Sequence, residues 1–437
     1  MTVLIEFKDL LGAPNLVLFG LAGSAAVSTW QCAPEEQTIL DQLDQVPWGH
    51  RPADAPEAVR KVGELIRTKL AGVPPIKKAL IDTFALGGMA PRPLYFRVSS
   101  SDVEAVPFEA VWDDHIESFA CLDPRWPIAR LPADAAEPAG PFTMERRVRL
   151  VAILAAEGVD PAGQLNALRD ARNAQSGLAV EVLVLTSSPA LVTEINDTQD
   201  PTWKAELVPA TADALVDRLR EIQPHLLHIF CHGTAAGPRL LIAQREDLAV
   251  LELSATHFET VAQPAFLAPW LVTLNCCEGA APGDQMGSLA SALVRAGMPA
   301  VLGMRKAVDV AMAHGFCADL YKAVFARLAE IAPGGRAVSD LDWASLLHKP
   351  RRSLATVHGA LDEVAGRQKE WTMPVLYLAT TNPQLRGMPT ADLDDAAVHE
   401  ELVTLGTADS LQAHGNLPPA QAAALRDQAL AVLYPQG

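Results

Sequence analysis

The sequence has little of what nucleic-acid-binding, membrane or secreted proteins need. It holds 35 Lys and Arg against 52 Asp and Glu, a formal net charge of −17, and no stripe of basic residues. Binding to a phosphate backbone depends on clustered Lys and Arg, so no nucleic-acid partner is expected. No apolar run approaches the ~20 residues of a membrane span. The acidic, proline-interrupted N-terminus lacks the pattern of a signal peptide.

Cysteine is also scarce, and its spacing excludes a disulfide framework. The six cysteines are Cys32, Cys121, Cys231, Cys276, Cys277 and Cys317, with no C-x-x-C pair. We therefore expect a reducing, cytoplasmic location and no association with a membrane. On a strand, His228 and His232 lie far apart along one face and Cys231 points to the other, which disfavours zinc. No metal or other cofactor is expected.

Several common catalytic motifs are missing. The chain contains no G-x-S-x-G, no P-loop and no G-x-G-x-x-G, which removes the usual signals of a serine hydrolase and of nucleotide chemistry. No period repeats along the chain, which argues against a solenoid.

What the sequence does contain is a regular alternation of continuous apolar runs and helical periodicity. Examples are "VRLVAILAA", "LAVEVLVLT", "HLLHIFCHG", "PWLVTLNCCEG" and "MPAVLGM", separated by segments such as "GQLNALRDARNAQSG", "ADALVDRLREIQ" and "GSLASALVRAG". Strands that are apolar on both faces and alternate with helices predict an α/β fold with a parallel sheet covered on both sides. Ligand sites in such sheets form at the carboxyl ends of the strands.

Composition also predicts the domain organisation. The segment "LPADAAEPAGP" is rich in Pro, Ala and Gly and reads as a linker. We therefore expect an N-terminal α/β subdomain over residues 1–141, a second over 142–388, and a helical tail over 389–437. In the last of these, Pro418 and Pro419 are suited to the start of a helix.

Two strand ends carry candidate catalytic residues. His232 closes "HLLHIFCHG" and can act as a general base, while Gly233 offers an unobstructed backbone N–H. Cys277, beyond the strand in "LVTLNCCEGA", is free to project into a cleft as the nucleophile. A backbone-satisfied histidine at the end of a buried strand is the alternative for His232. The matching cysteine, 45 residues later, favours the catalytic interpretation.

These motifs resemble the caspase-like cysteine peptidases, and within them the bacterial CHAT branch. In that family one strand ends in His-Gly and another in Ala-Cys-Glu-Thr-Gly. Here the second motif is "CCEGA", so Cys276 replaces the small residue and the Thr-Gly order is altered. "VEAVPFEAVWD", "GMPAVLGMRKAVDVAMAHGFCADLYKAV" and "EWTMPVLYL" resemble further family segments, with Phe108 replacing Trp in the first. The resemblance spans roughly residues 50–385.

The resemblance implies a caspase-like fold with an N-terminal pseudo-caspase-like subdomain. It maps the family's catalytic histidine and cysteine onto His232 and Cys277, with the N–H groups of Gly233 and Cys277 forming the oxyanion hole. It implies an endopeptidase with a protein substrate, switched on by a sensor or activator protein in trans, in bacterial immunity or cell death. The alternative is a catalytically inactive caspase-fold adaptor that binds a partner through the same cleft.

Substrate preference rests on residues near these strand ends. The carboxylates of Glu278, Asp284 and Asp309 favour a basic residue before the cleaved bond, whereas Met304 favours an apolar one. Arg305 and Lys306, in "GMRKAV", count against a basic preference, but on balance we expect a basic rather than an apolar residue there. For the tail we expect short helices that dock on the body, with recruitment of a partner as the alternative. Leu425, Leu430 and Val432 are expected to form their apolar face.

Overall fold

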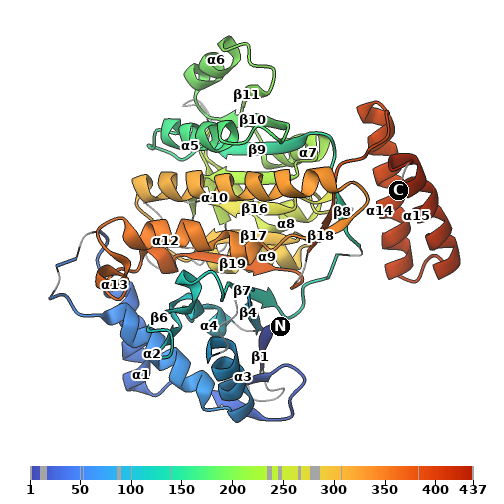
Figure 1. Ribbon diagram of the computed structural model, residues 1–437. Helices are drawn as coiled ribbons and strands as arrows, with labels where there is room; N and C mark the ends of the chain where they lie inside the picture. Colours follow the sequence, from blue (N-terminus) through green and yellow to red (C-terminus); the bar gives the residue numbers. More distant parts are fainter. Residues whose placement is uncertain are drawn as a thin grey trace.

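The computed structural model describes residues 2–9, 17–49, 51–52, 54–85, 90–99, 101–138, 140–233, 239–244, 249–263, 267–275, 286–306, 308–381 and 383–435. Its centre is a 12-stranded sheet with helices on both faces (Figure 1). From one edge to the other the strands are β11 (Trp203–Leu207), β10 (Val180–Thr186), β9 (Val148–Leu154), β12 (Leu226–Phe230), β16 (Leu271–Leu274), β17 (Ala300–Met304), β19 (Pro374–Leu378), β7 (Ile128–Pro132), β4 (Leu94–Val98), β1 (Val3–Asp9), β2 (Val17–Leu21) and β3 (Val27–Trp30).

The sheet is mostly parallel, as the apolar runs predict. Strands β11, β10, β9, β12, β16 and β17 are parallel to one another, whereas β19 runs antiparallel to β17. Every residue of β12, β16 and β17 is buried, because both faces are covered by helices and neither can expose polar side chains to water.

Helices cover the two faces of the sheet in separate groups. In Figure 1, α5 (Ala162–Asn173), α10 (Val310–Ile331) and α12 (His348–Thr356) lie in front, and α7 (Ala212–Ile222), α8 (Ala255–Glu259) and α9 (Met286–Arg295) lie behind. Side chains alternate between these two cores: Phe230 packs on the α10 side, and Ile229 and Cys231 pack on the α9 side. Within the described ranges, no helix has both the length and the apolarity needed to cross a membrane.

The N-terminal region continues the same sheet. Its strands β1, β2, β3, β4 and β7 extend beyond β19, and α1 (Pro34–Gln45), α2 (Ala58–Ala71) and α3 (Pro74–Ala85) pack against them. The expected boundary at residue 141 therefore falls in a connection between strands of one sheet. This connection leads through β8 (Phe142–Thr143) into β9.

The tail forms a helical hairpin at one side of the body (Figure 1). It consists of α14 (Asp395–Ala413) and α15 (Pro419–Leu433), so its helices are longer than the sequence predicts, and Pro419 does start α15. Leu430 is buried in a small core of the hairpin, but Leu425 and Val432 are 40% and 37% exposed. The expectation that all three share one packed face is therefore wrong: the buried face of α15 is formed by Ala422, Ala429, Leu430 and Leu433.

One predicted helix boundary also differs. The sequence places Ser288 at the start of a helix, whereas α9 begins two residues earlier, at Met286. The same helix ends before Gly297, whose φ of 108° is a conformation that favours glycine.

Candidate active site

The carboxyl ends of β9, β12 and β16 lie side by side. We call this end of the strands the carboxyl edge of the sheet. These strands are neighbours in the order β9-β12-β16, and their register pairs Phe230 with Leu154 and Ile229 with Leu274. Because the strands are parallel, the chain leaves all three at the same edge. The first described residues past these ends are the candidates for chemistry.

His232 lies two residues past β12. With Gly233 it forms the short strand β13 (His232–Gly233), which pairs with β14 (Arg239–Ile242) so that His232 opposes Leu241. The preceding Cys231 is fully buried in the core, which anchors the turn. The buried Cys231 and the pairing of β13 with β14 therefore hold the backbone of His232 in place.

The ring of His232 is oriented by one hydrogen bond. Its Nε2 lies 2.7 Å from the backbone carbonyl oxygen of Glu157, in the loop that follows β9. A carbonyl only accepts hydrogen bonds, so Nε2 carries the proton and Nδ1 is the free acceptor of the neutral ring. Nδ1 is buried and has no hydrogen-bond partner among the described residues. The ring thus presents an unprotonated nitrogen able to take a proton from a neighbouring group.

Asn275, the first residue after β16, is held in place by two hydrogen bonds. Its backbone N donates to the carbonyl of Ile229 at 2.8 Å, and its buried Nδ2 donates to the carbonyl of Ala313 in α10 at 2.9 Å. The expected nucleophile Cys277, its neighbour Cys276, and the pocket candidates Glu278 and Asp284 lie outside the described residues. Asn275 is the last described residue before them.

The other predicted site residues that the structure describes take part in packing, strand pairing or helix capping. Gly233 is buried and opposes Leu240. Met304 is 1% exposed and belongs to the core on the α10 side. Asp309 is the N-cap of α10, where its side chain accepts hydrogen bonds from the backbone N of Ala311 and Met312. Neither the Met304 side chain nor the capping oxygen of Asp309 is thus free for a substrate.

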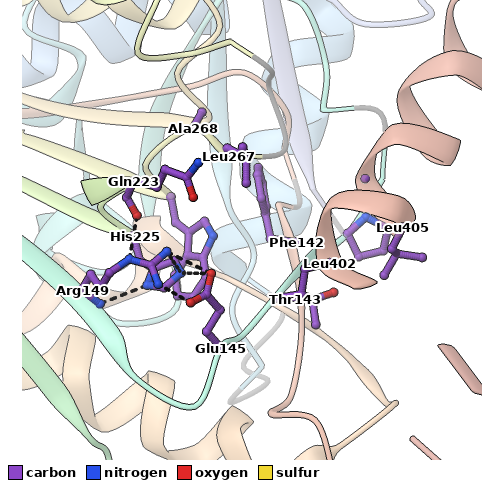
Figure 2. A pocket seen from close by; sticks show the side chains of 13 residues that line it. Phe142, Thr143, Glu145, Arg149, Gln223, His225, Leu267, Ala268, Leu402 and Leu405 are labelled. Atoms are coloured by element: carbon purple, nitrogen blue, oxygen red, sulfur yellow. Dashed lines mark hydrogen bonds and ion pairs between the residues drawn. The ribbon is translucent and has the colours of Figure 1, made fainter. Parts of the chain in front are cut away.

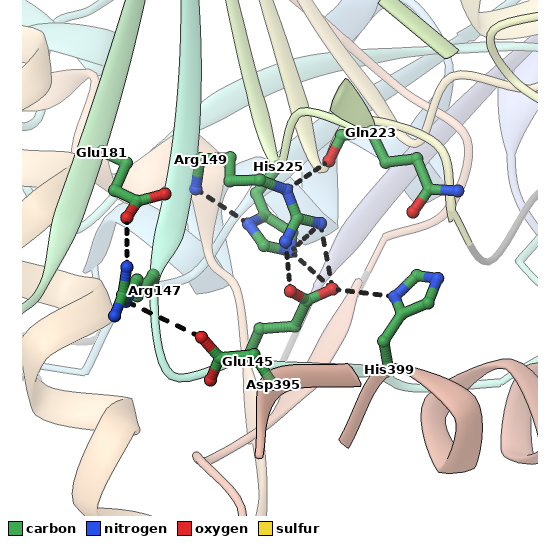
Figure 3. Close-up of polar contacts among 8 residues, drawn as sticks. All are labelled: Glu145, Arg147, Arg149, Glu181, Gln223, His225, Asp395 and His399. Atoms are coloured by element: carbon green, nitrogen blue, oxygen red, sulfur yellow. Dashed lines mark hydrogen bonds and ion pairs between the residues drawn. The ribbon is translucent and has the colours of Figure 1, made fainter. Parts of the chain in front are cut away.

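A second polar cluster lies at the opposite, amino ends of these strands, which we call the amino edge of the sheet (Figure 3). Arg149 binds Glu145 through both terminal nitrogens, and its backbone N donates to Nδ1 of His225 at 3.0 Å. The His225 ring stacks on Trp270 at 4.3 Å. On the tail, His399 Nδ1 lies 3.6 Å from Glu145. This cluster lines a cavity of about 40 Å³ between the body and α14 (Figure 2), with room for only about two or three water molecules.

The charge states in this second cluster follow from its contacts. Burial raises the pKa of Glu145, but its contacts with His225 and Arg149 outweigh burial and hold that pKa well below its ordinary value. Burial lowers the pKa of His225, and Glu145 opposes that shift. Glu145 is thus a satisfied anion with partners on every side, which suits a structural role.

Sequence reasoning missed two features of these sites. It did not identify the Glu157 carbonyl as the group that bonds His232, because no pattern in either segment marks a contact between them. The sequence "RRVR" also gave no sign of the second cluster, in which Arg149 is only 22% exposed and is bound to Glu145. His225, His228 and Cys231 are buried. Among the residues that the structure describes, no group of three or more His, Cys, Asp or Glu is placed to hold a metal ion.

The comparison with protein families decides the relationship. A model of the CHAT domain matches residues 60–333, more than half of the chain. The chain belongs to the CHAT domain family. The matched residues of this CHAT chain include β12, His232, Cys276 and Cys277. The comparison with curated proteins gave no match.

Two solved structures illustrate what this CHAT chain is similar to. One is a Saccharomyces cerevisiae separase–securin complex, at 11% identity and a TM-score of 0.34 over 84% of this chain and 21% of that chain. The other is the Arg-specific cysteine proteinase gingipain R, at 10% identity and a TM-score of 0.40 over 70% of this chain and 66% of that one. The chain thus spans about a fifth of the separase chain.

Proposed function

We propose that this CHAT chain is a caspase-like cysteine endopeptidase that uses His232 and Cys277. The observation that carries the proposal is the orientation of His232: Nε2 is tied to the Glu157 carbonyl, and Nδ1 is left without a partner among the described residues. Buried His228 also has a ring nitrogen without a hydrogen-bond partner, so the free Nδ1 supports the proposal through its place at the carboxyl end of β12, next to the strand that leads to Cys277.

The chemistry follows from this orientation. The Cys277 thiol transfers its proton to Nδ1 of His232, and the thiolate adds to the peptide carbonyl carbon. The N–H groups of Gly233 and Cys277 stabilise the oxyanion that forms. Protonated His232 then gives its proton to the leaving amine as the C–N bond breaks, which leaves an acyl-enzyme. Water, deprotonated by His232, adds to the acyl-enzyme and releases the acid and the thiol.

The Glu157 carbonyl has a defined part in these steps. It accepts from Nε2–H in both the neutral and the protonated ring, so the imidazole keeps its position throughout the cycle. It also stabilises the positive charge when Nδ1 is protonated. This backbone oxygen therefore acts as a positioning group for His232, in a place where many enzymes use a carboxylate.

The second candidate function is an inactive adaptor that binds a partner through the same edge. Labelling distinguishes the two. A peptide carrying a thiol-directed electrophile should label Cys277 of the wild-type chain and fail to label His232→Ala, because the thiolate no longer forms. Cys276→Ala is the matched control and should label normally. An adaptor would show no labelling that depends on His232.

Regulation is part of the proposal. An unrestrained cytoplasmic protease would damage its own cell, so we infer that a sensor or activator protein acts in trans. The protein substrate then belongs to a bacterial defence or cell-death response. Incubating the chain with products of neighbouring genes, with Cys277→Ala as the inactive control, tests this directly. Strong cleavage of many unrelated proteins by the isolated chain would contradict the need for an activator.

A further inference from the structure

Helix α15 is uncharged on its outer side as well as on the side that faces α14. Its inner residues are buried in the small core of the hairpin. Exposed, uncharged residues recur along the other side of the helix at spacings of three, four and seven, which place them on one face. They are Gln421, Ala424, Leu425, Gln428, Ala431 and Val432. We call these six residues the outer stripe.

Another surface helix, α7, shows the usual distribution of charge. It buries Leu215, Val216 and Leu219 in the core, and five of its 11 residues are charged. In α15 only Arg426 and Asp427 are charged, among 15 residues. A surface helix normally turns charged side chains to water on the face opposite its buried one, and the outer stripe of α15 has none.

The two charges of α15 are engaged within the protein. Arg426 donates through Nε to Asp409 of α14 at 2.6 Å and through Nη2 to Gln412 at 2.7 Å. Asp427 lies 3.9 Å from Arg336 of the body. Neither charge belongs to the outer stripe.

Helix α14 also has apolar residues on two sides, but both sides are covered. Leu402 and Leu405 line a cavity together with residues of the body, and Val398 and Leu405 belong to the hairpin core shared with α15. Helix α15 lies on the outer side of the hairpin (Figure 1), and its outer stripe is exposed. The stripe therefore has the composition of a covered face without a cover among the described residues.

Exposed apolar side chains gather on this hairpin. In the described part of the chain, seven large apolar side chains are exposed, and three of them, Leu411, Leu425 and Val432, belong to α14 and α15. These two helices have 19 and 15 residues in a chain of 437. Such a concentration is typical of a surface that another molecule covers.

The outer stripe is suited to pair with a copy of itself. Its residue types recur after seven residues, as in helices that pair along a seam: glutamine at 421 and 428, alanine at 424 and 431, and an aliphatic residue at 425 and 432. A glutamine amide has both donors and an acceptor, so Gln428 can bond to Gln428 of a second chain. Charges beside a seam select unlike partners. This stripe carries none, so nothing in it repels its own copy.

We propose that the outer stripe of α15 binds the outer stripe of a second copy of this chain about a two-fold axis. The two hairpins then form a four-helix bundle that buries both stripes between helices. The proposal goes beyond the peptidase function and does not depend on it. Helix α14 meets the amino edge, where His399 faces Glu145, so the carboxyl edge of each copy stays outside this contact.

The short stripe sets the expected strength of the dimer. A 15-residue helix is about 22 Å long, so the contact is smaller than a standard stable interface. We expect a dissociation constant on the order of 10 µM. Each chain has a net charge of −17, so two copies repel each other, and added salt should strengthen the dimer by screening that repulsion.

Sedimentation of the full chain under reducing conditions, between about 1 and 100 µM, tests the proposal. The wild type should change from monomer to dimer over this range. Leu425→Glu combined with Val432→Glu should weaken the dimer at least about tenfold, because like charges enter the seam. The melting temperature of the dilute monomer should not change. The matched control is Val27→Glu combined with Val357→Glu, which adds the same charges at exposed apolar positions outside the hairpin and should dimerise like the wild type.

A cysteine variant locates the contact. Mild oxidation of Gln428→Cys should join two chains by a disulfide, because the same residue of both copies lies in the seam. Lys204→Cys, in the edge strand β11, is the control and should stay at the wild-type background.

The other outcomes overturn the proposal. A wild type that is still monomeric at about 100 µM has no such dimer. A dimer that resists Leu425→Glu with Val432→Glu uses another surface, and oligomers that grow without limit exclude a two-fold contact. A monomer whose binding to an activator is lost in the same double variant would assign the outer stripe to a partner helix instead.

Discussion

Two histidines at the two ends of β12 differ in what surrounds them. His225, at the amino end, accepts from the backbone N of Arg149, faces Glu145 with its other nitrogen at 3.7 Å, and stacks on Trp270. His232, beyond the carboxyl end, bonds one backbone carbonyl and keeps a free nitrogen among the described residues. A fully satisfied imidazole stabilises a fold, whereas one with a free acceptor is available for proton transfer. The difference separates two residues that look alike in sequence.

The largest expected effect follows from removing the free acceptor. His232→Ala and Cys277→Ala should each lower kcat/KM by at least about 10³-fold, because the base or the nucleophile is lost. Thermal unfolding should stay close to that of the wild type. Cys276→Ala should retain most activity. If Cys276→Ala is inactive and Cys277→Ala is active, the nucleophile has been assigned to the wrong cysteine.

The third histidine of the segment, His228, sharpens the comparison through pH. It is fully buried in the middle of β12, and burial lowers its pKa from 6.5 to about 3. Below pH 6.5 the unfolded chain binds a proton that the folded chain refuses, so stability falls as the pH falls toward 3. This residue alone should cost about 3 kcal/mol between pH 6.5 and pH 4.

The control for this prediction is His228→Phe, which keeps a ring against Tyr321, 5.4 Å from the His228 ring in the native fold. The variant should lose less stability than the wild type over the same pH interval in denaturant unfolding. Identical pH profiles of the two proteins would show that His228 does not carry this dependence.

At the amino edge, Glu145→Gln should lower stability without touching catalysis. The carboxylate binds Arg149 and faces both His225 and His399, so its loss leaves the partly buried Arg149 guanidinium without its carboxylate partner. We expect a cost of about 2 kcal/mol in the free energy of unfolding. Because the pKa of Glu145 is depressed in the fold, its contribution is present above the unfolded pKa and disappears on acidification below it.

Peptide cleavage at neutral pH is the second readout for Glu145→Gln. Its kcat/KM should match the wild type within about twofold. A loss as large as that of His232→Ala would mean that the two edges of the sheet are coupled, and that the cluster is more than structural.

A smaller effect is expected at the start of α5, the helix that follows the loop that orients His232. A methyl group added at Gly163 would lie 2.1 Å from the His314 ring, which packs near Phe230 at the end of β12. The ring must move, so Gly163→Ala should cost about 1 kcal/mol of stability. The shift should also displace the loop carrying the Glu157 carbonyl and lower kcat/KM by up to about tenfold. Unchanged activity would show that this loop tolerates the displacement.

The smallest effect on catalysis should come from removing the tail. Truncation after Gly387 deletes contacts at the amino edge, including that of His399 with Glu145, and leaves the carboxyl edge intact. We expect reduced solubility, because Leu402 and Leu405 of α14 line one cavity with Phe142 and Leu267 of the body. We expect kcat/KM within about twofold of wild type. A soluble truncated protein that no longer responds to its activator would assign the tail to partner recruitment.

Sequence alone anticipates the fold class because its signals are local. The apolar run "VRLVAILAA" contains β9, and the helical spacing of "ADALVDRLREIQ" corresponds to α7. Each pattern can be recognised because it lies within a single element. The boundaries of elements are harder to predict from local sequence: α9 starts at Met286, before the expected Ser288. The inward face of α15 was predicted incorrectly, because which residues face inward depends on how α14 packs against it.

The sequence by itself determined the α/β fold class and marked His232 as a candidate base, with Cys277 as its expected partner. Only the tertiary structure decided which nitrogen of His232 is free, since that depends on a backbone carbonyl 75 residues away, and every residue type carries the same carbonyl. It also decided that Arg149 and Glu145 satisfy His225. Such contacts join segments far apart in the chain, so no local pattern encodes them.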